Sequence, residues 1–210
     1  MTTPENPTPD APNPEGQPKR QHLSARVPDN VSKGVFSTGV LVVTGATEFV
    51  LDFVQNLGQP ASVAARIIMP HSTVPQFIEA LKTNLDLYKG RFGDPPEIPQ
   101  QPPQAKKPTI QEIYDDLRIP DDVLTGSYAN GVMIGHAASE FKFDFLSNVI
   151  PQPVVSNRLY LAAPHVPRLL QSLIKTYEDL QQRIQQQREQ QQKPGDGTPP
   201  TEPPSTPPSS

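Results

Sequence analysis

Hydrophobic and polar positions alternate along two stretches of the chain, residues 47–53 (TEFVLDF) and 139–145 (SEFKFDF). A period of two predicts a β-strand with one buried face and one polar face. In the second stretch three aromatic side chains share the face that we expect in the core: Phe141, Phe143 and Phe145. The charged side chains share the other face: Glu140, Lys142 and Asp144.

These two strands belong to a longer internal repeat with an offset of 92 residues. Residues 26–93 align with residues 118–185 without a gap, and 19 of the 68 aligned positions are identical. Composition alone would give about four identities, so the chain contains an internal duplication.

Each copy predicts three strands followed by a helix. The strands are expected at residues 36–44, 47–53 and 63–69, and at residues 128–136, 139–145 and 155–161. Short loops join them, which favours an antiparallel meander. The first strand of each copy contains a glycine, Gly39 or Gly131, which is typical of a bulge or a close backbone approach.

An apolar stripe at helical spacing follows the third strand of each copy, so each helix is expected to cover one face of a sheet. The stripes are Val74, Phe77, Ile78, Leu81 and Leu85, and Val166, Leu169, Leu170, Leu173, Tyr177, Leu180 and Ile184. Thr73 is predicted to cap the start of the first helix, and Gly90 is predicted to end it. The second helix continues into the Gln-rich residues 185–192, either as a solvated extension or as a segment that binds a partner.

Proline separates the copies from the rest of the chain. Residues 1–20, 93–108 and 193–210 hold 19 of the 28 prolines and few large apolar side chains, so we expect them to be disordered. The predicted parts are a disordered tail (1–24), a first repeat (25–92), a Pro/Gln-rich linker (93–108), a second repeat with a short leading helix and an extended last helix (109–192), and a second disordered tail (193–210).

The predicted fold class is therefore α+β. We expect two tandem β-β-β-α repeats with antiparallel sheets and one helix per repeat. A three-stranded sheet with one helix leaves its edges or second face open, so the two repeats should pack together as an intramolecular pseudo-dimer.

The second copy resembles a bacterial family known as domain of unknown function 3467. The resemblance rests on YANGV at residues 128–132, ASEFKFDF at 138–145, NRL at 157–159 and the proline-led helix that follows. The first copy matches less well, because residues 36–38 read FST where the second copy has YAN. The resemblance implies a small α+β module, and the tandem arrangement implies that single-copy relatives dimerise. It transfers no activity.

Composition excludes several kinds of function. The chain has no cysteine, which excludes disulfides, thiolate metal sites and cysteine nucleophiles. A net charge of -4 without clustered basic residues disfavours nucleic acid as a partner. The sequence contains no apolar run of signal-peptide or membrane-span length, so we expect a cytoplasmic protein with no membrane partner.

Six charged residues form the candidate binding or inter-repeat face: Glu48, Asp52, Arg66, Glu140, Asp144 and Arg158. Within each copy the two carboxylates lie four residues apart on one strand, which is about 13 Å at the rise of a β-strand. That separation is too large for a paired-acid hydrolase. We expect the arginines to form ion pairs that fix strand register or the contact between the copies, and the alternative is a site for a small polar ligand.

No catalytic, metal or cofactor site is expected. None of the four histidines recurs at the offset of 92, and none has metal-ligand spacing with a second ligand. The chain has no Gly-x-Ser-x-Gly motif and no glycine-rich phosphate loop before a helix.

The main hypothesis is a non-catalytic protein-binding or scaffold module, whose strand edges or sheet face dock a protein partner. The alternative is a holdase chaperone that resembles SecB in combining an antiparallel sheet with C-terminal helices. A small-ligand-binding protein or enzyme is the third hypothesis. In each case we expect a monomer in which the two repeats pair within one chain.

Overall fold

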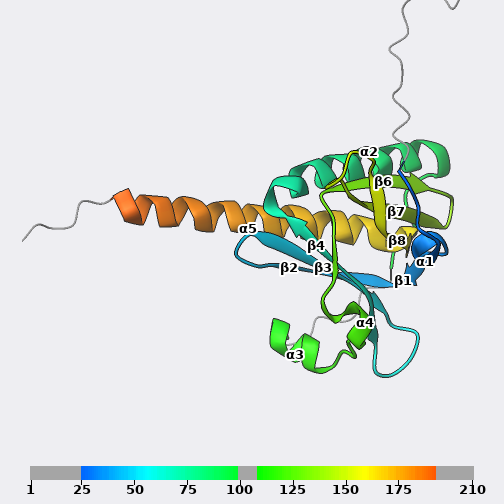
Figure 1. The fold of residues 1–210 in the computed structure, drawn as a ribbon, viewed down its shortest axis with the longest axis horizontal. Coiled ribbons are helices and arrows are strands. Elements are labelled where there is room, and N and C mark those ends of the chain that lie inside the picture. Colours follow the sequence, from blue (N-terminus) through cyan, green and yellow to red (C-terminus); the bar gives the residue numbers. More distant parts are fainter. Residues whose placement is uncertain (1–24, 99–107, 193–210) are drawn as a thin grey trace, which may run out of the picture.

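The structure is a computed structural model that describes residues 25–98 and 108–192. These residues form two four-stranded β-sheets and two long helices (Figure 1), which confirms the predicted α+β class with two tandem repeats. The predicted disordered tails, residues 1–24 and 193–210, lie outside the described residues, as do residues 99–107 of the predicted linker.

Each sheet has four strands in a fixed order. The first sheet has the order β2-β3-β4-β5, and the second has the order β1-β8-β7-β6. The strands of the first sheet are β2 (Gly39–Thr44), β3 (Glu48–Gln55), β4 (Ser62–Pro70) and β5 (Ser127–Tyr128). Those of the second are β1 (Val35–Ser37), β6 (Gly131–His136), β7 (Glu140–Ser147) and β8 (Val154–Ala162).

The two repeats exchange their first strands. Three antiparallel strands of each sheet form the predicted meander of one repeat, and the fourth is a short parallel strand from the other repeat. Val35 of β1 pairs with Leu159 of β8, and the equivalent Ser127 of β5 pairs with Ile67 of β4. The strand predicted at residues 36–44 is therefore two strands that belong to different sheets.

The break in this predicted strand has a local cause. The backbone N–H of Thr38 donates to Val54 O at 2.8 Å, and the Thr38 hydroxyl accepts from the N–H of Asn56 at 2.8 Å. Asn130 holds the same place in the second repeat, where its side chain accepts from the N–H of Asn148. These bonds fix the chain at the point where it passes from one sheet to the other.

The long helices are also exchanged. Helix α2 (Val74–Phe92) packs on β6 of the second repeat, and helix α5 (Val166–Gln192) packs on β2 of the first repeat. The two helices contact each other as well, and the C-terminal half of α5 projects beyond the sheets (Figure 1). Each helix thus covers a sheet, as predicted, but the sheet is that of the other repeat.

The ends of α2 differ from the prediction. Thr73 makes no side-chain capping bond, because it ends the 3-10 turn η1 (His71–Thr73) with helical φ and ψ of -88° and -24°. Gly90 does not end the helix, which continues to Phe92 and stops at Gly93. The N–H of Gly93 makes the last helical bond, to Lys89 O, and its φ of 83° then turns the chain out of the helix, a conformation that glycine adopts without strain.

The core is continuous across both repeats. Phe141, Phe143 and Phe145 are fully buried, as the alternation predicts. The rings of Phe143 and Phe145 contact Phe53 from the first sheet and Phe77 from α2, with centroids 5.7–6.3 Å apart. The aromatic face of one repeat is thus covered by the other repeat.

The predicted role of the two strand glycines is only partly observed. The bulges lie instead on the neighbouring strand pairs, next to Phe53 and Phe145. Nothing approaches Gly39, whereas a Cβ at Gly131 would lie 2.9 Å from the side-chain nitrogen of Asn148. Gly131 therefore marks a close approach of a side chain.

Three further short helices and one 3-10 turn complete the fold of the described residues. Helices α1 (Asp29–Ser32) and α4 (Asp121–Leu124) are equivalent in the two repeats, and the turn η2 (Ala163–His165) precedes α5. Helix α3 (Ile110–Asp115) is the predicted leading helix of the second repeat. Within the described residues, no helix is long and apolar enough to cross a membrane.

Candidate functional site: two equivalent ion-pair clusters and the hollows beside them

The strand registers bring each predicted arginine to an aspartate of its own repeat. The β3–β4 pairing sets Asp52 opposite Arg66, and the β7–β8 pairing sets Asp144 opposite Arg158. In the first pair Nε and Nη2 of the guanidinium donate to the two carboxylate oxygens at 2.7 and 2.8 Å. In the second pair the distances are 2.6 and 3.0 Å. Both pairs are therefore bidentate, the geometry that gives strong, directional bonds.

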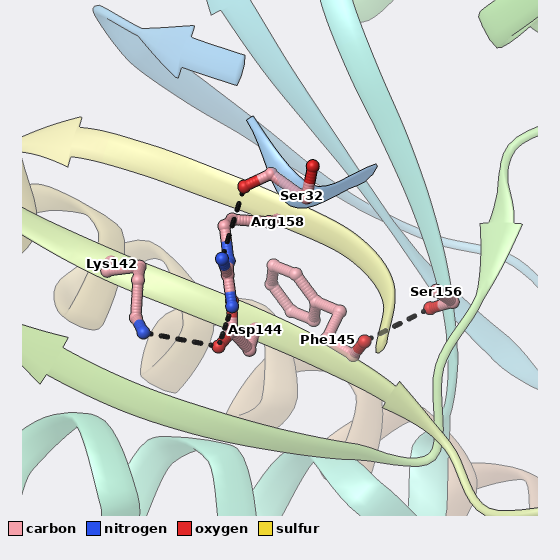
Figure 2. A network of polar contacts seen from close by, with 6 residues as sticks. All are labelled: Ser32, Lys142, Asp144, Phe145, Ser156 and Arg158. Atoms are coloured by element: carbon pink, nitrogen blue, oxygen red, sulfur yellow. Dashed lines mark hydrogen bonds and ion pairs between the residues drawn. The ribbon is translucent and has the colours of Figure 1, made fainter. Parts of the chain in front are cut away.

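Each guanidinium also links the two repeats. Nη1 of Arg66 donates to the carbonyl of Leu124 at 3.0 Å, and Nη1 of Arg158 donates to the carbonyl of Ser32 at 3.2 Å. Leu124 and Ser32 are the last residues of α4 and α1, and both belong to the other repeat. Figure 2 shows Arg158 between Asp144 and Ser32. The same side chain thus fixes strand register and closes the contact between the repeats.

The two clusters differ in their third partner. The Tyr114 hydroxyl, from α3, donates to Oδ2 of Asp52 at 2.6 Å, whereas Nζ of Lys142 lies 3.3 Å from Oδ2 of Asp144. Burial, together with the hydrogen bond to Asp52, raises the pKa of Tyr114 to about 12. Its hydroxyl therefore stays protonated and acts as a hydrogen-bond donor. In the first cluster α3 is held over the outer face of the sheet by this bond.

Both aspartates are almost completely shielded from solvent. Asp52 has no exposed surface and Asp144 is 3% exposed. The hydrogen bonds to these carboxylates raise the pKa of Arg66 and of Arg158, so both arginines stay charged. Buried charges persist in proteins when they are paired and hydrogen-bonded, which is the condition met here. Chemically, the clusters offer paired charges and no free nucleophile or base.

The two predicted glutamates do not join the clusters. Each accepts a hydrogen bond from the hydroxyl of the preceding residue, Thr47 for Glu48 and Ser139 for Glu140. Within residues 25–98 and 108–192 neither glutamate forms an ion pair. The candidate face therefore reduces to two Asp–Arg pairs, and the glutamates lie apart from them.

Two glycines of the clusters were missed in the sequence. Gly34 and Gly126 are equivalent, with φ values of 68° and 73°. A Cβ at Gly126 would lie 2.9 Å from Cγ of Arg66, and a Cβ at Gly34 would lie 2.8 Å from Cγ of Arg158. Their recurrence at the offset of 92 was a visible signal. The roles of Tyr114 and Lys142 had no such signal, because neither side chain recurs in the first repeat.

Two of the histidines have packing roles. Nε2 of His71 lies 3.1 Å from the Thr44 hydroxyl and 3.2 Å from Glu48 O. The ring of His136 packs against Tyr88 and Phe141. In the part of the chain that the structure describes, no three His, Asp or Glu side chains gather as metal ligands.

Hollows on the surface of the described residues lie beside the long helices and the ion-pair clusters. One of about 560 Å³ runs between β2, α3 and α5, and one of about 320 Å³ lies between β6 and the start of α2. An apolar trough of about 460 Å³ lies between α2 and α5. Another, of about 280 Å³, is lined by both repeats next to Arg158.

Comparison with known proteins identifies the family. The family model described as "Protein of unknown function (DUF3467)" matches residues 1–100 and again residues 96–186. The chain therefore belongs to this family and carries two tandem copies of its domain. No curated protein and no solved structure matches the chain.

Proposed function

We propose that this member of the DUF3467 family is a non-catalytic protein-binding module, which holds an extended segment of a partner protein along the edge of β2. The observation that carries the proposal is an edge strand bordered by a groove. We further propose a cytoplasmic protein that acts as a monomer, because the exchange of strands and helices pairs the repeats within one chain.

Strand β2 offers an edge for a further strand. It is the terminal strand of the first sheet and pairs only with β3 among the described residues. All six of its residues are partly exposed, whereas the centre of β3 is buried. An edge strand presents backbone N–H and C=O groups that an extended peptide can pair with.

The groove beside this edge suits a peptide. Val42, Val43 and Thr44 line it from β2, and Ile110 lines it from α3. The other wall consists of polar side chains of α5: Thr176, Asp179, Gln182, Arg183 and Gln186. Aliphatic groups of β2 and α3 thus face amide, hydroxyl and charged groups of α5 across the groove. This mixture fits a peptide with alternating apolar and polar side chains.

The second sheet repeats the arrangement. Strand β6 is its terminal strand, and a hollow at the start of β6 is lined by Gly131 and Val132 together with Gln76 and Phe77 of α2. Each edge is thus bordered by the long helix of the other repeat. A module with two such edges can hold two segments of one partner, which increases avidity without any further contact.

The test is a selection of random peptides by display on the full chain, followed by hydrogen exchange of the complex. We expect a selected peptide to slow the exchange of backbone amides in residues 39–44. Filling the groove with Gln182→Trp should then weaken binding by at least about tenfold. The matched control is Gln181→Trp on the same helix, because Gln181 does not line the groove.

Two outcomes would overturn the proposal. One is protection confined to surfaces other than β2, and the other is equal affinity in the two tryptophan variants. A third measurement separates the module from a SecB-like holdase, which would suppress the aggregation of several unrelated client proteins. A binding module should leave that aggregation unchanged.

A further inference from the structure

The edge of β2 that no described strand pairs with presents backbone groups at every second residue. In an antiparallel pair, residues whose N–H and C=O groups bond to the neighbouring strand alternate with residues whose groups point away from it. The N–H of Gly45 donates to Glu48 O at 2.8 Å, which fixes this alternation at the hairpin end of β2. The N–H and C=O groups of Val40, Val42 and Thr44 therefore point away from β3, along the free edge.

The side chains of β2 define the two faces that an added strand would share. Val42 packs against the core, on the side of the sheet that α5 covers. Leu41 and Val43 lie on the other face. There Leu41 pairs with Asp52, whose carboxylate accepts the hydrogen bond from Tyr114 of α3. Residues directly opposite each other in neighbouring strands share a face of the sheet. A strand added at this edge therefore turns its side chains alternately toward α5 and toward α3.

The walls on these two sides differ in chemistry. The α5 side is formed by hydroxyl, amide and charged side chains. The α3 side is aliphatic, because Ile110 of α3 lines the groove together with Val43 and is 56% exposed. An apolar side chain placed against Ile110 would remove apolar surface of both partners from water, which is favourable. The two faces of an added strand thus meet different environments.

The same chemistry disfavours pairing between the β2 edges of two chains. Residues 40–43 of β2 read VLVV, so a second copy of this strand would set aliphatic side chains against the polar wall of α5 whichever face it turned there. Polar groups that lose water without gaining a hydrogen bond are destabilising. The edge therefore suits a segment of another protein better than a second copy of itself.

We propose that the segment bound at β2 alternates in a fixed orientation, with its polar side chains toward α5 and its apolar side chains toward α3. This inference rests on the proposed peptide site. Backbone bonds to Val40, Val42 and Thr44 hold a segment as long as β2, six residues. Ile110 selects for the apolar positions. Tyr114 is a positioning residue, because its hydroxyl bond holds α3 beside the edge.

Photo-cross-linking tests the orientation. The probe is a peptide selected by display on the full chain, with a photoreactive diazirine side chain introduced at one position at a time. Mass spectrometry of the digested product locates each cross-link. We expect cross-links to α3 or Val43 from the apolar positions of the peptide, and to α5 from its polar positions. The reverse assignment, or cross-links that do not alternate, would overturn the inference. Slowed exchange of the amides in residues 39–44 would still support the peptide site in that case.

Variants of α3 test its part in recognition. Ile110→Ser should raise the Kd of the same peptide at least about fivefold, because an apolar contact is lost. Gln111→Ser is the matched control, since Gln111 is exposed on α3 and does not line the groove. Equal Kd values for these two variants would show that α3 does not select the peptide.

A double substitution separates positioning from a purely structural role of Tyr114. Tyr114→Phe should raise the Kd, and Ile110→Ser should then have little further effect, because a released α3 no longer presents Ile110 to the peptide. Additive effects of the two substitutions would remove Tyr114 from recognition. Failure to select any peptide that protects β2 would overturn the proposed function and this inference together.

Discussion

Arg158 satisfies two kinds of partner with one rigid side chain. Nε and Nη2 of its guanidinium donate to the carboxylate of Asp144. Nη1 donates to the carbonyl of Ser32, at the end of α1 in the other repeat. The pairing with Asp144 was predictable, since both residues recur on the polar faces of adjacent predicted strands. The bond to Ser32 was not, because it depends on where the other repeat places its first helix.

Removing the guanidinium should therefore be costly. Arg158→Gln removes the main partner of the buried Asp144 and leaves only Lys142, so we expect a loss of about 2–3 kcal/mol in the free energy of unfolding, the range for hydrogen bonds to charged groups. Chemical denaturation measures it. Glu140→Gln is the control and should change stability by less than about 0.5 kcal/mol, because Glu140 lies outside the cluster. Equal losses in the free energy of unfolding for the two variants would show that the ion-pair cluster does not stabilise the fold.

Gly126 offers a second test at this scale. Its φ of 73° is unfavourable for any residue with a Cβ, and that Cβ would meet both Arg66 and Ile68 at 2.9 Å. We expect Gly126→Ala to lower the free energy of unfolding by about 2 kcal/mol. Gly39→Ala should be close to neutral, since nothing lies within 4 Å of that position. Similar Tm values for both variants would contradict the backbone argument.

At the scale of elements, the strands with strict alternation are found where the sequence predicts them. The second strand of each repeat was expected at residues 47–53 and 139–145 and is observed at Glu48–Gln55 and Glu140–Ser147. The break in the first strand was not predictable from periodicity, because residues 35–44 (VFSTGVLVVT) contain no proline or charged residue that would separate Val35–Ser37 from Gly39–Thr44. Hydrogen bonds of Thr38 with residues on another strand decide it.

Substitutions on the two faces of β7 test which face is buried. Phe145 is fully buried and its ring contacts Phe53 and Phe77, so Phe145→Ala should cost about 3–5 kcal/mol in stability. Lys142 lies on the opposite face with its side chain 40% exposed, and Lys142→Ala should cost less than about 1 kcal/mol. Denaturant titrations measure both losses. A larger loss of stability for Lys142→Ala than for Phe145→Ala would show that the assignment of the buried and exposed faces of β7 is wrong.

Docking of α3 should depend on pH through Tyr114. Its pKa is raised to about 12 in the folded protein, from about 10 in an unfolded chain. The folded state therefore holds this proton more tightly, so its contribution to stability is complete below pH 10 and is lost as the pH rises towards 12. We expect the stability difference between wild type and Tyr114→Phe to shrink across that window in denaturation experiments. A difference that stays constant from pH 9 to 12 would show that the hydroxyl does not hold α3.

At the scale of the whole molecule, the repeats are interdependent. Each sheet takes its parallel edge strand and its covering helix from the other repeat. The prediction of a pseudo-dimer followed from the duplication and from the open surfaces of a single copy. The exchange of strands and helices could not be predicted, because short local patterns do not specify which copy a segment packs against.

The exchange of strands and helices gives a specific prediction for a single copy expressed alone. Residues 109–192 alone would have β6, β7 and β8 without the β1 and α2 that complete their sheet, and α5 would have no β2 to cover. Phe143 and Phe145 would lose their contacts with Phe53 and Phe77, which exposes a large aromatic surface to water. Two such copies can restore these contacts only by placing β5 and α5 of each on the sheet of the other.

We therefore expect residues 109–192 to form a homodimer whose unfolding midpoint rises with protein concentration, because folding and association are then one equilibrium. Sedimentation gives the mass and denaturant titration gives the midpoint. Phe145→Ala in this fragment should weaken the dimer further, whereas Lys142→Ala should leave it intact. A well-folded fragment that stays monomeric at high micromolar concentration would show that one repeat completes its own core, and the exchange would then be dispensable for folding.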